Sequence, residues 1–376
     1  MTVEQIIWTP KNQWEMVLDQ GLEESAQLVL AFGSRSLLED DVLYAELSSL
    51  YPNAELVSCT TAGSILQDEV LDDSLVVNAI HFEKTNLRVI ELPLTGNTYS
   101  TAKELFSSLT ADNLQHIMLF TDGTFTNGTE LTLAIDETLT GVTVNGGFAA
   151  DGITAERTLI GLNNPPKESK MVAVGLYGTS LKISSDVGSG WNTFGVKRQV
   201  TESSSNIVTG IEGAPALDLF ESFLGTLSDE LPSSGMLIPI GLIDDNSFDI
   251  TMAGLVDVDR RNKSLIFNQN IPEGSSMYFM KADTDSLVLK AGTAASQCLK
   301  KLKEVKPEFA FLVSSLGRKM TMRQWTEDEL EEINTQLSGE IPISGFYGHG
   351  EISPHRKYRS GEVHSHCIAV TLFCEL

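Results

Sequence analysis

The stretch IPISGFYGHGEISPH, residues 341–355, decides how the rest of the chain is interpreted. It begins as an apolar strand and then has three glycines within six residues, which let the backbone turn and let another group approach it closely. His349 and Glu351 are two residues apart, so in a continuing strand both side chains point to the same side. An imidazole, a carboxylate and bare backbone on one side would form the wall of a ligand site. The same residues also fit a β-bulge followed by a turn, with Glu351 bonded to nearby amides.

Two earlier segments of the chain repeat the pattern that leads into this stretch. In each of the three, an apolar strand is followed by a helix, a second apolar strand and a glycine-bearing bend. The strand–helix–strand segments are 28–61, 117–147 and 309–345, and their bends are residues 59–63, 145–151 and 345–351. Such units imply crossover connections and partly parallel sheets, in which ligands bind beyond the carboxyl ends of strands. The sequence therefore predicts an α/β fold with α+β elements and mixed sheets, and three bends at the ligand-binding end.

The middle of the chain has four strand-like runs with no helix between them, which predicts an antiparallel sheet. These runs are residues 236–244, 248–258, 263–270 and 276–282. We place a boundary in the polar run 201–206, so that the chain divides into an N-terminal domain, 1–205, and a C-terminal domain, 206–376. A helix is also predicted at 12–20, and in the third segment, where the helix is predicted at 326–337, Thr326 and Glu329 would form a capping box.

The composition excludes some classes of partner. The 376 residues include 51 acidic and 26 basic side chains, a net charge of −25, and this balance argues against binding to nucleic acid or to an anionic membrane. The apolar runs are far shorter than the ~20 residues of a membrane span. The first residues lack the pattern of a signal peptide, and the four scattered cysteines fit reduced thiols. We therefore expect a cytoplasmic protein.

Histidines gather near the end of the chain, and they allow a second reading of the site. His349, Glu351, His364 and His366 could form the centre of a metal-dependent hydrolase, although no HExxH or paired-cysteine spacing accompanies them. Arg318 follows the strand 309–315, where a guanidinium could hold a ligand carboxylate or pair with a carboxylate of the chain itself. The sequence has no P-loop, no GxGxxG after the first strand and no GxSxG motif, so nucleotide and serine-hydrolase chemistry have no specific support.

Five short motifs, taken in order, resemble the FIST sensory domains, both the N-terminal and the C-terminal part. They are SCTTAG at 58–63, NGGFAAD at 145–151, GW at 190–191, GIEGAPA at 210–216 and GFYGHGEISP at 345–354. The resemblance covers nearly the whole chain, and the last motif is the most specific. The chain departs from the family pattern at Ser315, where a cysteine is frequent, and at Ser365, where His-Asn is usual in place of His-Ser.

The resemblance implies a bacterial sensor of small ligands in signal transduction and not an enzyme. The most specific hypothesis is a haem b-based nitric oxide sensor that acts on a separate histidine kinase. The second hypothesis is a sensor of an amino-acid-like molecule. His349 is the expected haem-iron ligand by its position. The expected binding residues are His349, Tyr347, Phe346, Gly350, Glu351, Arg318, Gly147 and Gly63. A homodimer is compatible with this reading.

Overall fold

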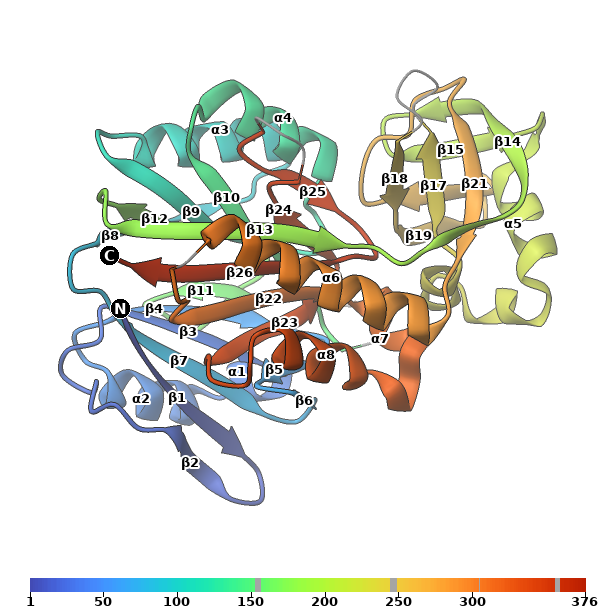
Figure 1. The fold of residues 1–376 in the computed structure, drawn as a ribbon. Helices are drawn as coiled ribbons and strands as arrows, with labels where there is room; N and C mark the ends of the chain where they lie inside the picture. Colours follow the sequence, from blue (N-terminus) through green and yellow to red (C-terminus); the bar gives the residue numbers. More distant parts are fainter. Residues whose placement is uncertain (153–156, 244–248, 304, 356–358) are drawn as a thin grey trace.

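The computed structural model describes residues 1–152, 157–243, 249–303, 305–355 and 359–376, and it contains four β-sheets (Figure 1). Three six-stranded sheets form the main body, and the fourth is a separate β-sheet at its side. The α/β class with mixed parallel and antiparallel sheets is as the sequence predicts.

The three six-stranded sheets are built from strands far apart in the chain. The first sheet contains β1 (Thr2–Thr9), β2 (Gln13–Leu18), β3 (Leu28–Gly33), β4 (Glu55–Thr60), β7 (Leu75–His81) and β11 (Ile160–Leu162). The second contains β8 (Asn86–Pro93), β9 (Leu114–Thr121), β10 (Thr143–Phe148), β12 (Lys170–Tyr177), β24 (Gly350–Ser353) and β25 (Glu362–His364). The third contains β5 (Ser64–Leu66), β6 (Glu69–Leu71), β13 (Leu181–Gly188), β22 (Phe309–Ser315), β23 (Ile343–Gly348) and β26 (Ile368–Glu375).

One arrangement recurs in all three sheets, and we call each occurrence a repeat. A parallel pair, β3/β4, β9/β10 or β22/β23, is flanked by an antiparallel strand, β7, β12 or β26, and then by β1, β8 or β13. After its bend, each repeat gives a strand to another sheet. Strand β5 pairs with β23, β11 with β4, and β24 with β10. The three segments with a shared pattern in the sequence are therefore one closed, strand-exchanging unit.

Helices cover the outer faces of the three sheets, and their inner faces meet in one core. The helices of the main body are α1 (Arg35–Leu38), α2 (Asp41–Leu50), α3 (Thr98–Leu109), α4 (Gly128–Thr138), α6 (Thr284–Leu302), α7 (Leu316–Met322) and α8 (Asp328–Gln336), with a 3-10 turn at Arg323–Trp325. Helix α5 (Ala216–Leu224) and the 3-10 turns Gly225–Glu230 and Ser233–Leu237 belong to the segment of the fourth sheet, and α5 packs against that sheet. Four phenylalanines, one from β3, one from β9 and two from the third repeat, meet at the centre: Phe32, Phe120, Phe311 and Phe346. The Phe32 and Phe346 ring centroids are 5.1 Å apart. Burial of this aromatic surface from all three sheets holds the repeats together.

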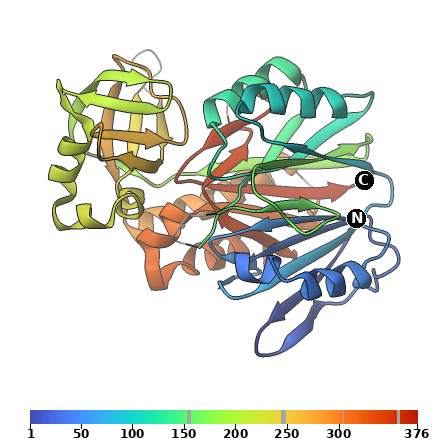
Figure 2. The same ribbon diagram turned by 180° about the vertical axis from the view of Figure 1, so that it is seen from behind.

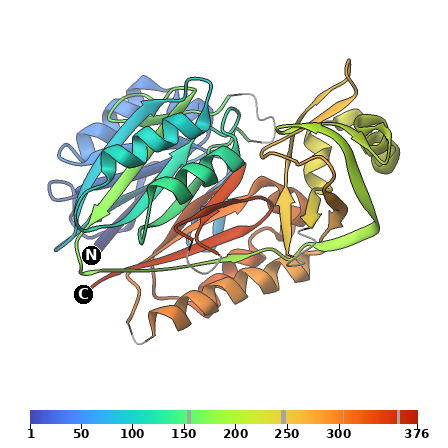
Figure 3. The same ribbon diagram turned by 90° about the horizontal axis from the view of Figure 1, so that it is seen from above.

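A fourth sheet, residues 192–281, is inserted between β13 and α6 of the third repeat, and we call it the inserted sheet. Its strands are β14 (Asn192–Ser204), β15 (Ile207–Ile211), β16 (Ala214–Pro215), β17 (Ile240–Ile243), β18 (Ile250–Ala253), β19 (Leu255–Asp259), β20 (Ser264–Phe267) and β21 (Ser276–Lys281). All their pairings among the described residues are antiparallel, as predicted. Seen from above, the long strand β14 leads out to this sheet, and α6 runs back along the third sheet (Figure 3). The view from behind shows the inserted sheet apart from the chain termini, which lie together (Figure 2).

Several local predictions are wrong. Residues 12–20 are not a helix, because Gln13 begins β2, which pairs with β1 in a hairpin. The capping box at Thr326 does not form: Glu329 turns into the protein interior instead of capping α8. The predicted domain boundary at 205–206 lies in the turn between the paired strands β14 and β15, and it stays a prediction. Asp244 and Phe248, at the ends of two predicted strands, lie outside the described residues.

Candidate functional site

The three bends meet, because a backbone hydrogen bond links each one to the next. The bonds run from the Ala62 N–H to the Tyr347 carbonyl (2.8 Å), from the Ala150 N–H to the Thr60 carbonyl (2.9 Å) and from the His349 N–H to the Phe148 carbonyl (3.2 Å). Equivalent positions of the three repeats thus make equivalent bonds around a ring. The sequence analysis predicts that the three bends lie together at one end of the sheets, and in the structure they do.

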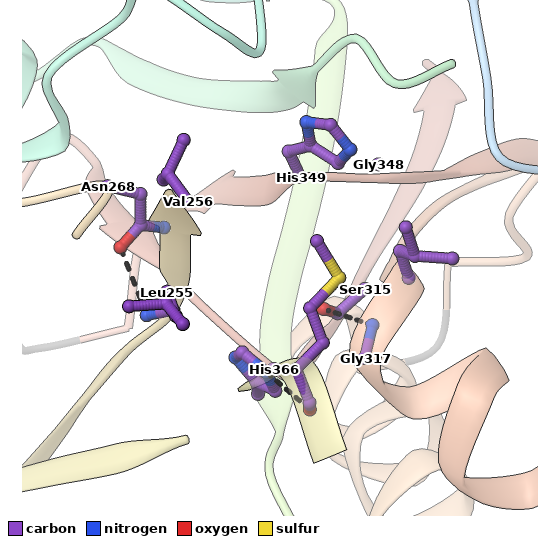
Figure 4. Close-up of a pocket in the computed structure, with 11 residues that line it drawn as sticks. Leu255, Val256, Asn268, Ser315, Gly317, Gly348, His349 and His366 are labelled. Carbon is purple, nitrogen blue, oxygen red and sulfur yellow. Dashed lines mark hydrogen bonds between the residues drawn. The ribbon is translucent and has the colours of Figure 1, made fainter. Parts of the chain in front are cut away.

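A cavity opens where the bend of the third repeat meets the inserted sheet (Figure 4). We call it the junction cavity, and its volume is about 30 Å³. The main body contributes Ser315, Leu316, Gly317, Gly348, His349 and His366, and residues 192–281 contribute Met236, Gly254, Leu255, Val256 and Asn268. A volume of ~10–15 Å³ is enough for one water molecule, whereas sites for drug-sized ligands measure ~300–1,000 Å³. The junction cavity as it stands therefore holds one or two waters, and a larger ligand requires its two walls to move apart.

His349 presents an unpaired nitrogen in this cavity. A hydrogen bond to the Gly123 backbone favours the charged ring, so in that bond the imidazole is the donor. Nε2 is covered from solvent and has no hydrogen-bond partner among the described residues, which assigns the donor role to Nδ1. Nε2 is then the nitrogen with the free lone pair. Burial lowers the pKa of His349, so the ring is neutral at pH 7.

His366 presents a second unpaired nitrogen. Its Nε2 is 3.0 Å from the Met236 carbonyl, an acceptor, so Nε2 carries the proton and Nδ1 has the lone pair. This Nδ1 is buried and has no partner among the described residues. Burial lowers the pKa of His366 to about 4. The ring packs edge-on against Trp191, whose indole N–H donates to the His366 carbonyl at 2.7 Å.

The other polar groups of the cavity are already engaged. The Asn268 amide donates to Ser365 Oγ at 2.5 Å and accepts from the Gly254 N–H at 3.1 Å. Ser315 Oγ accepts from the Gly317 N–H at 3.2 Å. No lysine or arginine lines the cavity among the residues that the structure describes. The cavity therefore combines apolar walls with two neutral hydrogen-bond acceptors.

Most of the predicted binding residues do not face this cavity. Phe346 belongs to the central aromatic core, and a Cβ on Gly147 would meet Phe346 and Val313 there. Gly350 lies against the Phe148 ring, so a larger side chain at 350 would disturb packing before it blocked a ligand. Of the eight predicted residues, His349 alone lines the junction cavity.

Arg318 and Tyr347 form a buried network with Glu329. Two guanidinium nitrogens of Arg318 donate to Glu329 Oε2, at 2.9 and 2.6 Å. The Tyr347 hydroxyl and Ser314 Oγ donate to Oε1, at 2.7 and 2.9 Å. Both charged side chains are fully buried. Of the two roles open to Arg318 in the sequence, the structure has the internal ion pair and not a ligand contact.

Glu351 is also turned away from the cavity. Its Oε2 accepts from the Cys367 N–H at 3.1 Å, and its Oε1 has no partner within the described part of the chain. Burial raises the pKa of Glu351 well above the usual range of a carboxyl. The expectation that His349 and Glu351 share one wall is wrong, because β23 ends at Gly348 and a new strand begins at Gly350. The alternative reading, a break in the strand with Glu351 bonded to an amide, describes the structure.

Gly63 lines a second, more open cavity at the first bend, with Arg35, Asp72, Asp151 and Lys319 among its walls. Four of its charged groups form two pairs. Arg35 contacts Asp151 at 3.2 Å, and Lys319 contacts Asp72. This second cavity has no unpaired buried nitrogen or oxygen among the described residues.

The four residues of the hydrolase alternative do not assemble. His364 Nε2 is 3.1 Å from the Ser353 carbonyl, and His366 has a φ of +59°, so the strand β25 does not continue through both histidines. Within the described ranges, no three His, Cys, Asp or Glu side chains are placed to share a metal ion.

No helix in the described part of the chain is long and apolar enough to cross a membrane.

Fold and cavity together define a class: a three-repeat α/β protein with an inserted sheet and a cavity at their junction. The chain belongs to the FIST family. The FIST N domain matches residues 27–214, and the FIST C domain matches residues 216–354. FIST domains are associated with small-ligand sensing in signal transduction.

Relatives add little about the ligand. Two uncharacterized proteins of Mycobacterium tuberculosis, MT0656 of strain CDC 1551 and Rv0628c of strain H37Rv, are each 24% identical over 360 residues, which is 93% of this chain and 91% of theirs. Among solved structures, a cyanuric acid hydrolase from A. caulinodans shares 9% identity over 92% of this chain and 90% of its own, with a TM-score of 0.31. A likeness that weak carries no argument about fold or reaction.

Proposed function

We propose that this protein is a sensor whose small ligand binds in the junction cavity. The observation that carries the proposal is the pair of unpartnered nitrogens, His349 Nε2 and His366 Nδ1, on two histidines that line one cavity. A buried polar atom without a partner costs free energy in a folded protein, and a bound ligand would remove this cost.

The location of the cavity also supports a sensory role. Asn268 reaches from the inserted sheet to Ser365, and the Asn268 carbonyl accepts from the Gly128 N–H at 2.8 Å. Asn127 and Asn270 form a further bond across the same junction, at 2.8 Å. A ligand that touches both sides would bind one arrangement of the junction better than another, and such differential affinity is what shifts a conformational equilibrium.

Haem b is the cofactor that the family resemblance suggests. The cavity meets one of the requirements for binding haem and fails to meet two others. His349 Nε2 has the free lone pair that an axial ligand needs. However, a cavity of about 30 Å³ is far too small for a tetrapyrrole, and no described lysine or arginine lines the cavity to pair with propionates. The ring therefore does not fit the cavity as it stands. Haem and nitric oxide sensing stay predictions, which a hemin titration tests through a Soret band that His349→Ala abolishes.

The amino-acid-like ligand and a separate histidine kinase partner are also untested predictions. Kinase autophosphorylation, measured with and without the sensor and a bound ligand, tests the partner. The amino-acid reading requires that a free amino acid raise the melting temperature of the protein.

The main experiment is a thermal-shift screen of the full chain against a fragment library, the proteinogenic amino acids and hemin. Two valine variants locate the binding site. Val256→Phe fills the junction cavity from the inserted sheet, whereas Val196→Phe adds the same ring at a position of the inserted region that is 65% exposed. A true ligand raises the melting temperature of the wild type and Val196→Phe but not of Val256→Phe. The proposal fails if no compound shows this pattern.

A further inference from the structure

The junction cavity offers acceptors and no formal positive charge, and this restricts the chemistry of its ligand. We propose that the cavity binds a molecule with an apolar body and N–H donors, of the amidine or amine class, and not a carboxylate or phosphate. This inference rests on the proposed function and goes further, because it names the ligand class.

The first argument is hydrogen-bond complementarity. Each imidazole uses its N–H on a backbone acceptor, His349 on Gly123 and His366 on Met236. The nitrogen left over on each ring can only accept a hydrogen bond. A ligand with N–H groups satisfies these lone pairs. A carboxylate or phosphate would instead bring more lone pairs against them and lose its hydration without compensation.

The second argument is electrostatic. The carboxylates of Asp122 and Asp151 act on His349 and favour positive charge at its position. The chain as a whole carries a net charge of −25. The Arg318 guanidinium acts in the opposite direction on His366. An amidinium or ammonium group is therefore attracted to the His349 side of the cavity, where an anion is repelled. Hydrogen bonds with a charged donor are also stronger than neutral ones.

The third argument concerns the walls. Leu255, Val256 and Met236 from residues 192–281 line the cavity together with Leu316 from the main body. The space between them measures about 30 Å³, so a ligand with a ring binds only when the two walls move apart, and its apolar body then contacts these side chains, which cannot satisfy polar atoms. Figure 4 shows His349 and His366 entering the space from different sides, so the donors and the apolar body of a ligand have separate contacts.

Three probes with the same ring test the inference by isothermal titration calorimetry: benzamidine, benzyl alcohol and benzoate. We expect benzamidine to bind at least about tenfold more tightly than benzoate, with benzyl alcohol between them. Equal or tighter binding of benzoate overturns the inference.

Two substitutions at one position then test the acceptor role. His349→Gln keeps an acceptor oxygen near the place of Nε2, while His349→Met has similar length and only a weak thioether acceptor. We expect His349→Met to weaken benzamidine binding by about tenfold and His349→Gln to weaken it less. Benzamidine binding that is unchanged in both His349→Met and Val256→Phe would mean that the probe binds elsewhere, which overturns the inference.

The outcomes for the two proposals differ. If none of the three probes binds but another compound in the screen is sensitive to Val256→Phe, the ligand class is wrong and the sensory cavity stands. If no compound of any class is sensitive to Val256→Phe, the cavity is not a ligand site and both proposals fail.

Discussion

Replacing Glu329 by glutamine would remove the negative charge at the centre of the third repeat and leave almost everything else in place. Arg318 donates two hydrogen bonds to Glu329 Oε2, and Tyr347 and Ser314 each donate one to Oε1. Arg318 and Glu329 have no side-chain exposure. The variant therefore leaves the buried guanidinium of Arg318 without its counter-charge. The new amide N–H₂ group would also face side chains that donate hydrogen bonds themselves.

The expected cost is large on the scale of protein stability. Breaking a buried ion pair by removing one partner typically costs ~3–5 kcal/mol, because the remaining charge stays desolvated. Arg318 keeps its bonds to the Ser189 and Leu287 carbonyls, which hold the guanidinium in place and prevent it from reaching water. Since whole proteins are stable by only ~5–15 kcal/mol, Glu329→Gln should lose a substantial part of the total.

Equilibrium urea unfolding, followed by far-ultraviolet circular dichroism and tryptophan fluorescence, measures this loss. Glu340→Gln is the matched control, since it breaks the Glu340–Lys306 pair, in which both side chains are mostly exposed. We expect the control to unfold at nearly the wild-type urea concentration. A loss below about 1 kcal/mol in Glu329→Gln, with both probes coincident, would refute the view that this charge pair is desolvated and essential to the third repeat.

Three further predictions concern pH and backbone. Because burial raises the pKa of Glu351, the folded state holds a proton that the unfolded state releases. The free energy of unfolding therefore falls as pH rises above the ordinary carboxyl pKa. Glu351→Gln should flatten this dependence, measured by urea unfolding at a series of pH values. His366, with its pKa lowered to about 4, acts oppositely: stability falls as pH drops from about 6.5 to about 4, and His366→Asn should reduce the acid slope by up to about 1.4 kcal/mol per pH unit. Gly146 has a φ of +136°, and its Cβ would lie 1.9 Å from the Leu119 carbonyl oxygen. Gly146→Ala should therefore cost roughly 3 kcal/mol or more, against about 1 kcal/mol for Gly96→Ala, where the space is open; equal thermal-shift losses would contradict this.

The repeat pattern was accessible from sequence because hydrophobic periodicity and glycine position are local signals. The strands β3, β9 and β22 are apolar runs, and each of the following strands ends at a bend. The hairpin at residues 2–18 was not accessible in the same way. Its second strand is mostly exposed and gains its shape from pairing with β1, so nothing in its own composition marks it as a strand.

The site was only partly accessible for a related reason. His349 stands out beside its glycines, but the groups that complete the cavity come from Gly254 to Val256 and Asn268 of the inserted sheet. Their apposition depends on how that sheet docks, which local sequence does not express. Arg318 and Glu351 looked like ligand groups for the opposite reason: sequence displays charge but not the burial and internal pairing that engage them.

The three-repeat architecture also explains why the junction cavity lies at the third bend. Ala62, Ala150 and His349 make equivalent backbone bonds, so the scaffold treats the three positions alike. Alanine at the first two has no polar side-chain group, whereas the third has an imidazole with a free lone pair. The third repeat also contains the inserted sheet, and residues of that sheet line the other side of the cavity. The imidazole and the inserted sheet, the two features that set the third repeat apart, therefore meet at one place. There the ring of bends forms one wall of the cavity and the inserted sheet forms the other. A ligand-dependent shift of one wall relative to the other requires this arrangement.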